Sequence, residues 1–127
     1  MNTPAIISIT IGAALGALLR WWLGLKMNAI FPTIPLGTLA ANVMGGFLIG
    51  VFMGITRNHM FIPEAARLAI TTGFLGGLTT FSTFSAETVM LVAHQEYLWA
   101  SLIVIGHVAG SILATICGIY SVKFFTP

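Results

Sequence analysis

Residues 76–85 read GGLTTFSTFS, two glycines followed by hydroxyl side chains that surround two phenylalanines. Each glycine inside a helix costs about 1 kcal/mol relative to alanine. A third glycine, Gly73, lies about one helical turn before these two. Thr79 and Thr80 are β-branched, which lowers helix propensity further. The stretch therefore predicts a break in its helix, although hydroxyl side chains can also bond to the carbonyl groups of an unbroken helix.

The sequence around this stretch is strongly apolar. Hydrophobic residues make up 57% of the 127 residues and charged residues 6%, whereas soluble domains carry about a quarter charged residues. The mean hydropathy is +1.01. These values predict an all-α integral membrane protein, and the small formal charge of +2 argues against a nucleic-acid-binding protein.

Three connecting segments divide the apolar sequence, and they read MNAIFPTIP, TRNHMFIPEAAR and AHQEYLW. A membrane-spanning helix needs about 20 apolar residues. We therefore expect a single membrane domain over residues 1–127 with four spans, at about 4–25, 36–55, 68–92 and 98–122. The predicted break lies within the third span. Unwound backbone at that depth persists only where it is buried in protein or lines a polar cavity, and such breaks commonly form ion sites.

Small residues recur at four-residue intervals in the other predicted spans. They are Gly12 and Gly16, then Gly46, Gly50 and Gly54, then Gly106, Gly110, Ala114 and Gly118. Such rows let helices approach each other closely in lipid. They predict a compact helix bundle that associates with itself.

The basic residues give little indication of orientation in the membrane. Cytoplasmic loops normally carry an excess of Lys and Arg. Four spans place Arg57, Arg67 and Lys123 on one side, and Arg20 and Lys26 on the other. So small a difference allows both orientations and a pair of opposed copies, but a single charge can also be enough to fix one orientation.

Polar side chains also occur inside the predicted spans. Asn42 lies within the second span, and a four-residue spacing places His107, Ser111 and Thr115 on one face of the fourth. Together with hydroxyls that follow the break, notably Ser82, Thr83 and Ser85, they predict a polar track. The alternative is that each is an ordinary interhelical hydrogen-bonding residue, worth only about 0.6 kcal/mol.

Two strongly ionisable residues also lie within the predicted spans, Arg20 and Glu87. Charged groups inside a membrane are costly and usually functional. Glu87 alternatively bonds a neighbouring hydroxyl, and Arg20 alternatively extends to the lipid headgroups.

The track suits a small anion because its donors are hydroxyls, an amide and an imidazole, without a ring of carboxylates. Phe81 and Phe84 lie three residues apart on one helix face. The edge of a phenyl ring is electropositive, so these two rings have the character to contact an anion. Packing is the commoner use of phenylalanines at this spacing.

The nonamer GGLTTFSTF at residues 76–84, with Asn42 in the preceding span, resembles the signature of the small fluoride channels of the CrcB or Fluc family. The likeness extends over the whole chain in length, four-span layout, broken third helix and polar fourth helix. It implies a bacterial cell-membrane protein that forms an antiparallel, dual-topology homodimer with two fluoride pores. The implied function is passive export of cytoplasmic fluoride, which lowers fluoride toxicity.

The resemblance also implies roles for particular residues. Phe81 and Phe84 would form an aromatic box for fluoride. Arg20 would give the vestibule a positive potential that gathers anions, and Glu87 would lie near the polar track. The pore would be lined by polar side chains from three spans: Asn42, Ser82, Thr83, His107, Ser111 and Thr115. The backbone carbonyls of Gly76 and Thr79 from both subunits would hold a structural sodium ion that is not transported.

Two other functions remain open at this point. A proton-coupled small multidrug exporter is also a short four-span dimer, but it needs a glutamate in its first span, and residues 1–27 contain none. A structural membrane subunit would need only the glycine rows. An enzyme is not expected, because no hydroxyl nucleophile is paired with a base and a carboxylate in a soluble pocket.

Overall fold

The computed structural model describes residues 2–57 and 61–126, and every regular element in these ranges is helical. Three helices are long and uninterrupted: α1 (Thr3–Met27), α2 (Leu36–Arg57) and α6 (Tyr97–Phe125). Residues 58–60 of the predicted second connection lie outside the described residues.

The third helical region is interrupted, as its sequence predicts. It consists of α3 (Glu64–Leu68), the π-helix η1 (Ala69–Leu75), α4 (Gly76–Leu78) and α5 (Phe81–Ala93). Between α4 and α5, Thr79 and Thr80 are extended, with φ/ψ of −85°/152° and −149°/116°. The prediction of an all-α membrane fold with a broken third helix is therefore confirmed.

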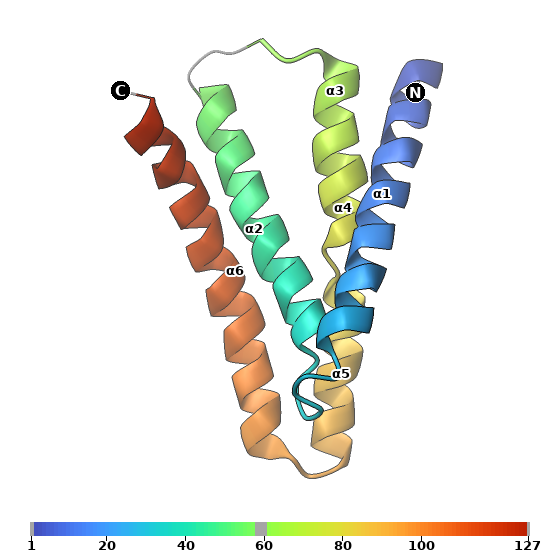
Figure 1. The fold of residues 1–127 in the computed structure, drawn as a ribbon, viewed down its shortest axis with the longest axis vertical. Coiled ribbons are helices and arrows are strands. Elements are labelled where there is room, and N and C mark those ends of the chain that lie inside the picture. The colour runs from blue at the N-terminus through green and yellow to red at the C-terminus, as the bar shows by residue number, and fades with distance from the viewer. Residues whose placement is uncertain (1, 58–60, 127) are drawn as a thin grey trace.

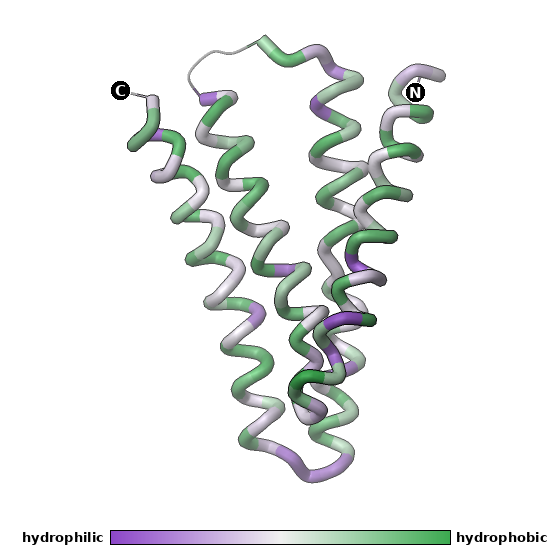
Figure 2. Tube along the Cα trace, viewed as in Figure 1, coloured by the Kyte–Doolittle hydropathy of each residue, from purple (hydrophilic) through white to green (hydrophobic). Residues whose placement is uncertain are grey.

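In the described part of the chain, α1, α2 and α6 are the helices long and apolar enough to cross a membrane by themselves. Each helical piece of the third region is too short to cross a membrane by itself. Placed end to end, these pieces extend along the whole length of the molecule (Figure 1). Hydrophilic residues gather mainly at the ends and turns of the helices (Figure 2). The break thus lies between long apolar helices, which carry a few hydrophilic residues at its level.

The helices form two pairs that diverge toward the end of the molecule carrying both termini (Figure 1). α6 packs along α2, and η1 and α4 pack along α1. Glycines allow both close approaches: a Cβ atom on Gly46 would lie 2.7 Å from the carbonyl oxygen of Ser111, and one on Gly73 would lie 2.8 Å from that of Ile9. Of the predicted rows, Gly12 and Gly16 face the backbone of η1 and α4, and Gly46 and Gly50 face that of α6. In the row on α6, Gly106 and Gly110 meet only side chains of α2.

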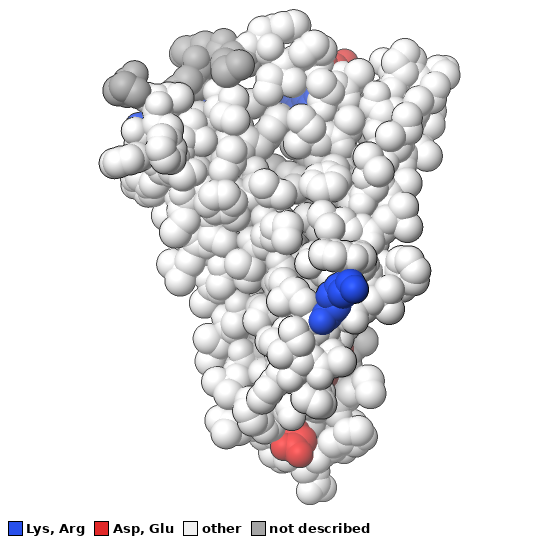
Figure 3. All heavy atoms as spheres, in the orientation of Figure 1, with Lys and Arg blue, Asp and Glu red and all other residues white. Residues whose placement is uncertain are grey.

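The outer surface is apolar, as expected for a protein surrounded by lipid. Large hydrophobic side chains such as Trp21, Leu102 and Ile112 are exposed along the helices, while the buried interior is small and includes Leu78 and Ile103. Charged side chains are sparse on the face seen in Figure 3. Residues from α2, from the broken region and from α6 meet at the narrow side of the opening between the pairs, where the candidate site lies.

Candidate functional site

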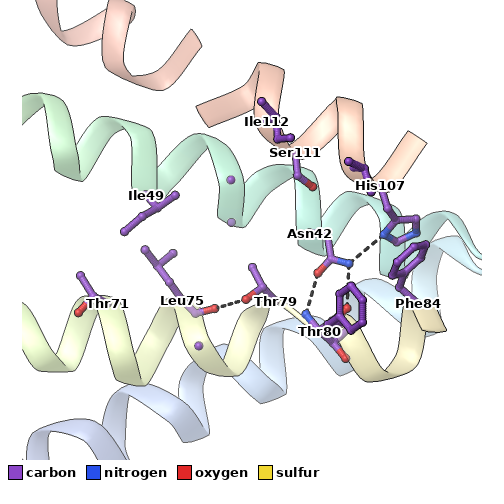
Figure 4. Close-up of a pocket in the computed structure, with 15 residues that line it drawn as sticks. Asn42, Ile49, Thr71, Leu75, Thr79, Thr80, Phe84, His107, Ser111 and Ile112 are labelled. Carbon is purple, nitrogen blue, oxygen red and sulfur yellow. Dashed lines mark hydrogen bonds between the residues drawn. The ribbon is translucent and has the colours of Figure 1, made fainter. Parts of the chain in front are cut away.

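A cavity of about 500 Å³ lies between the two helix pairs at the level of the break (Figure 4). Its walls come from α2, from the interrupted region and from α6. They include seven of the predicted site residues: Asn42, Gly76, Thr79, Phe81, Phe84, His107 and Ser111. Five other predicted residues are not part of these walls: Arg20, Ser82, Thr83, Glu87 and Thr115.

Asn42 of α2 holds the break through both backbone groups of Thr80. Its Oδ1 accepts the Thr80 N–H at 2.7 Å, and its Nδ2 donates to the Thr80 carbonyl at 3.0 Å. The same Nδ2 lies 2.9 Å from Nδ1 of His107 on α6 (Figure 4). One amide therefore connects the three walls of the cavity.

These bonds explain why the helix breaks at this position. In a continuous helix the N–H of Thr80 would donate to Gly76, and that of Thr83 to Thr79. Instead, Thr80 donates to Asn42, and Thr83 donates to the Thr80 hydroxyl at 3.1 Å, which caps the start of α5. The carbonyls of Gly76 and Thr79 lose their helical donors, and no side chain in the described residues replaces them.

Two other carbonyls near the break are bonded within the chain. Arg20 Nε of α1 donates to the Gly77 carbonyl at 3.1 Å, and the Thr79 hydroxyl donates to the Leu75 carbonyl at 2.8 Å. Arg20 is thus bonded to the interrupted helix, where it provides a hydrogen-bond donor for a backbone carbonyl at membrane depth. Its guanidinium places a positive charge beside the interrupted helix.

The two phenylalanines of the motif have very different surroundings. Their ring centroids are 5.5 Å apart at an interplanar angle of 74°, so an edge faces a ring. Phe84 is 7% exposed and stacks on His107 at 4.5 Å, whereas Phe81 is 77% exposed. Phe84 is therefore packed against other residues of the same chain, whereas most of the Phe81 side chain is exposed on its surface.

The predicted polar track is divided between two environments. His107 and Ser111 line the cavity, but the Thr115 hydroxyl donates to the Gly46 carbonyl at 2.9 Å, within the contact between α2 and α6. Near the break, Thr83 Oγ1 accepts a 3.0 Å bond from the Thr80 hydroxyl, and Ser82 Oγ lies 3.3 Å from the same oxygen. The hydroxyls of the motif form a small cluster of their own at the start of α5.

Glu87, one turn farther along α5, accepts a 2.6 Å hydrogen bond from Thr38 of α2. It borders a second cavity of about 340 Å³ at the narrow end of the molecule, together with His94 and Glu96. Its Oε2 and the Nε2 of His107 are buried without a hydrogen-bond partner in the described part of the chain. Leaving such a group unpaired costs about 1–3 kcal/mol, so both positions favour a polar guest.

The sequence profile of the family described as "CrcB-like protein, Camphor Resistance (CrcB)" matches residues 7–119. The chain belongs to the CrcB family. Relatives of this CrcB chain include the "Fluoride-specific ion channel FluC" of Nitrosospira multiformis, 54% identical over 98% of this chain and 97% of the relative. The protein of that name from Thiobacillus denitrificans is 52% identical over 94% and 97%. Bacterial relatives and apolar helices make this an integral protein of the bacterial cell membrane.

Two residues that build the site of this CrcB chain are absent from the predicted site residues, Thr38 and Thr80. Thr38 precedes Asn42 by four residues, so the i, i+4 rule provides a signal that they share a face of α2. Thr80 acts through its backbone N–H and C=O, which its residue type does not reveal. Its clamp depends on a partner 38 positions earlier in the chain.

Proposed function

We propose that the protein is a fluoride-selective, passive ion channel that exports cytoplasmic fluoride and so lowers fluoride toxicity. The observation that carries this proposal is its identity of about half, over nearly the whole chain, to relatives named as fluoride-specific ion channels. Since those relatives are named as channels, the protein is not an enzyme. The residues around the break provide a physical basis for anion passage.

The proposed pathway uses uncharged donors and ring edges. Phe81 and Phe84 are within reach of one another, and Ser111 lies on the same cavity. Electropositive ring edges and hydroxyl donors attract an anion without the strong binding of a full positive charge, which would slow its release. Narrowness and the cost of removing water from fluoride would supply selectivity over chloride.

The remaining predicted residues would extend this pathway toward the two sides of the membrane. Ser82 and Thr83 would do so through the hydroxyl cluster at the start of α5, whereas the Thr115 hydroxyl is bonded to the Gly46 carbonyl and would contribute through the packing of α6 against α2. Arg20 would raise the local positive potential that gathers anions, and Glu87 would border the opening at the narrow end.

We assign the working unit to an antiparallel, dual-topology homodimer with two pores. A single chain leaves Phe81 77% exposed and the cavity open between the helix pairs. A second, inverted copy at this face would cover both and would bring two helix breaks together. The weak charge bias between the two sides of the chain agrees with insertion in both orientations.

The freed carbonyls fit a structural sodium ion at the centre of that dimer. Gly76 and Thr79 present backbone oxygens that have lost their helical donors, and both residues line the cavity. Unwound carbonyls of this kind bind sodium in membrane proteins. When bound, the cation supplies the positive charge that compensates these oxygens, and we propose that it is not transported.

Ion efflux from liposomes tests the function. The purified protein is reconstituted with potassium fluoride inside, valinomycin is added, and external fluoride is followed beside a chloride-loaded control. We expect rapid fluoride efflux and little chloride efflux. A folded protein that moves neither ion would refute the channel, and equal movement of both would refute its selectivity.

Topology and cation dependence test the assembly separately. Single cysteines introduced at one end of the chain in a Cys117→Ser background should be labelled from both sides of the membrane. Replacing sodium by a larger cation during purification should shift the dimer toward monomer. A single orientation would refute the inverted dimer, and a dimer indifferent to the cation would refute the central sodium site.

A further inference from the structure

The orientation of the Asn42 side-chain amide is fixed by the backbone of Thr80. The Thr80 N–H can only donate, so it requires the amide oxygen, and the Thr80 carbonyl can only accept, so it requires the amide nitrogen. A flipped amide would place donor against donor and acceptor against acceptor. Nδ2, and not Oδ1, therefore faces His107.

This orientation determines the protonation of His107. Because Nδ2 can only donate, Nδ1 of His107 must accept its hydrogen across the 2.9 Å separation. The ring is then neutral and carries its proton on Nε2. An Nδ1–H tautomer or an imidazolium would oppose two N–H groups at this contact.

His107 also contacts Phe84, one of the two phenylalanines of the proposed pathway. Its ring stacks on Phe84 with centroids 4.5 Å apart and planes inclined by 26°. The side chain is only 4% exposed, so neither contact is easily exchanged for water. One buried imidazole thus holds both the amide of Asn42 and the ring of Phe84.

The two hydrogens of Asn42 Nδ2 are both engaged in this arrangement, one with Thr80 and one with His107. An anion that approaches the amide must replace one of these acceptors. The Thr80 bond maintains the helix break, so the bond to His107 is the one that can be exchanged without unfolding the break. The imidazole therefore keeps one amide N–H paired beside Phe84 until an anion takes it.

We propose that His107, as the neutral Nε2–H tautomer, is a positioning residue that accepts the second N–H of the Asn42 amide and keeps this donor paired until an anion takes it past Phe84. This inference rests on the proposed fluoride channel and adds a tautomer and a hydrogen-bonding role to it. Its distinguishing requirement is an acceptor at the position of Nδ1. A histidine that merely fills space would require only the ring.

The tautomer is measured first, independently of transport. The protein is labelled with ¹⁵N-histidine in a His59→Gln, His94→Gln background, so that His107 gives the only imidazole signals. We expect an unprotonated Nδ1 and a protonated Nε2 at neutral pH. A protonated Nδ1 would overturn the proposal, whether or not the channel conducts.

Two substitutions then separate the acceptor from the ring. His107→Asn places an amide oxygen near the position of Nδ1 but removes the stacking ring, and His107→Phe keeps the ring but removes the acceptor. We expect His107→Asn to retain fluoride efflux within about threefold of the native protein, and His107→Phe to lower it by about tenfold, because the second N–H of Asn42 then has no acceptor between one anion and the next. The opposite ranking would overturn the positioning role.

The exposed Tyr97 at the start of α6 provides the control, because Tyr97→Asn and Tyr97→Phe should both leave efflux unchanged. Size-exclusion chromatography establishes that each variant folds, and the NMR result still decides if His107→Phe does not. Native protein without fluoride efflux would refute the proposed function. Native protein that conducts, with both His107 variants unchanged, would refute this inference alone.

Discussion

The contact between α2 and α6 and the region around the helix break use the same residue types to different ends. Between α2 and α6, Gly46 brings the backbones together, and the Thr115 hydroxyl bonds the Gly46 carbonyl. At the break, glycine and threonine release backbone groups, and the carbonyls of Gly76 and Thr79 lose their helical donors. The first region is completed by hydrogen bonds within the chain, while in the second the described residues provide no side-chain donor for these two carbonyls.

This contrast separates residues that maintain the fold from residues that we propose act on an ion. A substitution between α2 and α6 should reduce stability, and fluoride transport should be lost because the protein no longer folds. A substitution at the break can reduce transport while the chain still folds. The following predictions test that separation, from the largest expected effect to the smallest.

Gly46→Leu should have the largest effect. Its Cβ alone would lie 2.7 Å from the Ser111 carbonyl oxygen, so α2 and α6 would have to separate. Overpacking of this kind costs about 1–3 kcal/mol or more. We expect little monodisperse protein by size-exclusion chromatography, and a stable, conducting Gly46→Leu protein would show that this contact does not maintain the fold.

Asn42→Ala should have the next largest effect, because it removes the partners of both backbone groups of Thr80 and of His107. We expect the unfolding free energy to fall by about 3 kcal/mol and fluoride efflux to be lost. Thr56→Val is the control, since that hydroxyl bonds only within its own helix. Equal stability of the two variants in denaturant unfolding would contradict the clamp.

Phe84→Ile and Phe81→Ile should differ in stability but agree in transport. Phe84 is buried against His107, so its replacement should lower the unfolding free energy by about 1–3 kcal/mol, whereas that of the exposed Phe81 should change stability little. Both variants should conduct fluoride slowly because the aliphatic group lacks an electropositive edge. Unchanged efflux in both would refute the aromatic box.

Gly73→Ala and Gly76→Ala compare two glycines in one interrupted helix. A Cβ on Gly73 would lie 2.8 Å from the Ile9 carbonyl oxygen, but the nearest atom to one on Gly76 is 3.7 Å away. We expect Gly73→Ala to lose about 1–3 kcal/mol and Gly76→Ala to keep the chain folded while weakening the sodium-dependent dimer. The measurement is the dimer–monomer equilibrium of each variant over a series of sodium concentrations. A Gly76→Ala dimer as stable as the native one would count against the central sodium site.

Thr38→Val should have the smallest effect. It removes the 2.6 Å hydrogen bond to Glu87 without changing the size of the side chain greatly. We expect a loss of about 1 kcal/mol in denaturant unfolding. Thr10→Val serves as the control because its hydroxyl bonds only a carbonyl in the preceding turn of α1. An equal effect in the two variants would mean that the Thr38 bond to Glu87 contributes no more than a local one.

Local sequence predicts much of this architecture. Apolar length predicts the long helices, and the glycines and β-branched threonines of residues 76–85 predict the break. The same motif, with Asn42, identifies the family through its resemblance. These features depend on residue type and spacing along one segment, so a single sequence is sufficient to reveal them.

The roles of individual side chains depend on contacts across the fold. Sequence alone gives Phe81 and Phe84 equal standing, yet packing of α5 against α6 buries only Phe84. It places Thr115 on the polar track, yet the close approach of α2 directs its hydroxyl to Gly46. It leaves open whether Arg20 extends to headgroups, and the structure joins it to Gly77.

The sequence by itself determined that this is a helical membrane protein of the CrcB family with a weak point in its third helix. Only the tertiary structure decided how that weak point is held open. Asn42 can replace the helical hydrogen bonds of Thr80 because packing of α2 against the interrupted helix brings the amide within 3.0 Å of that backbone. A hydrogen bond forms only when donor and acceptor lie about 3 Å apart, so the fold decides which residue becomes the partner of a freed backbone group.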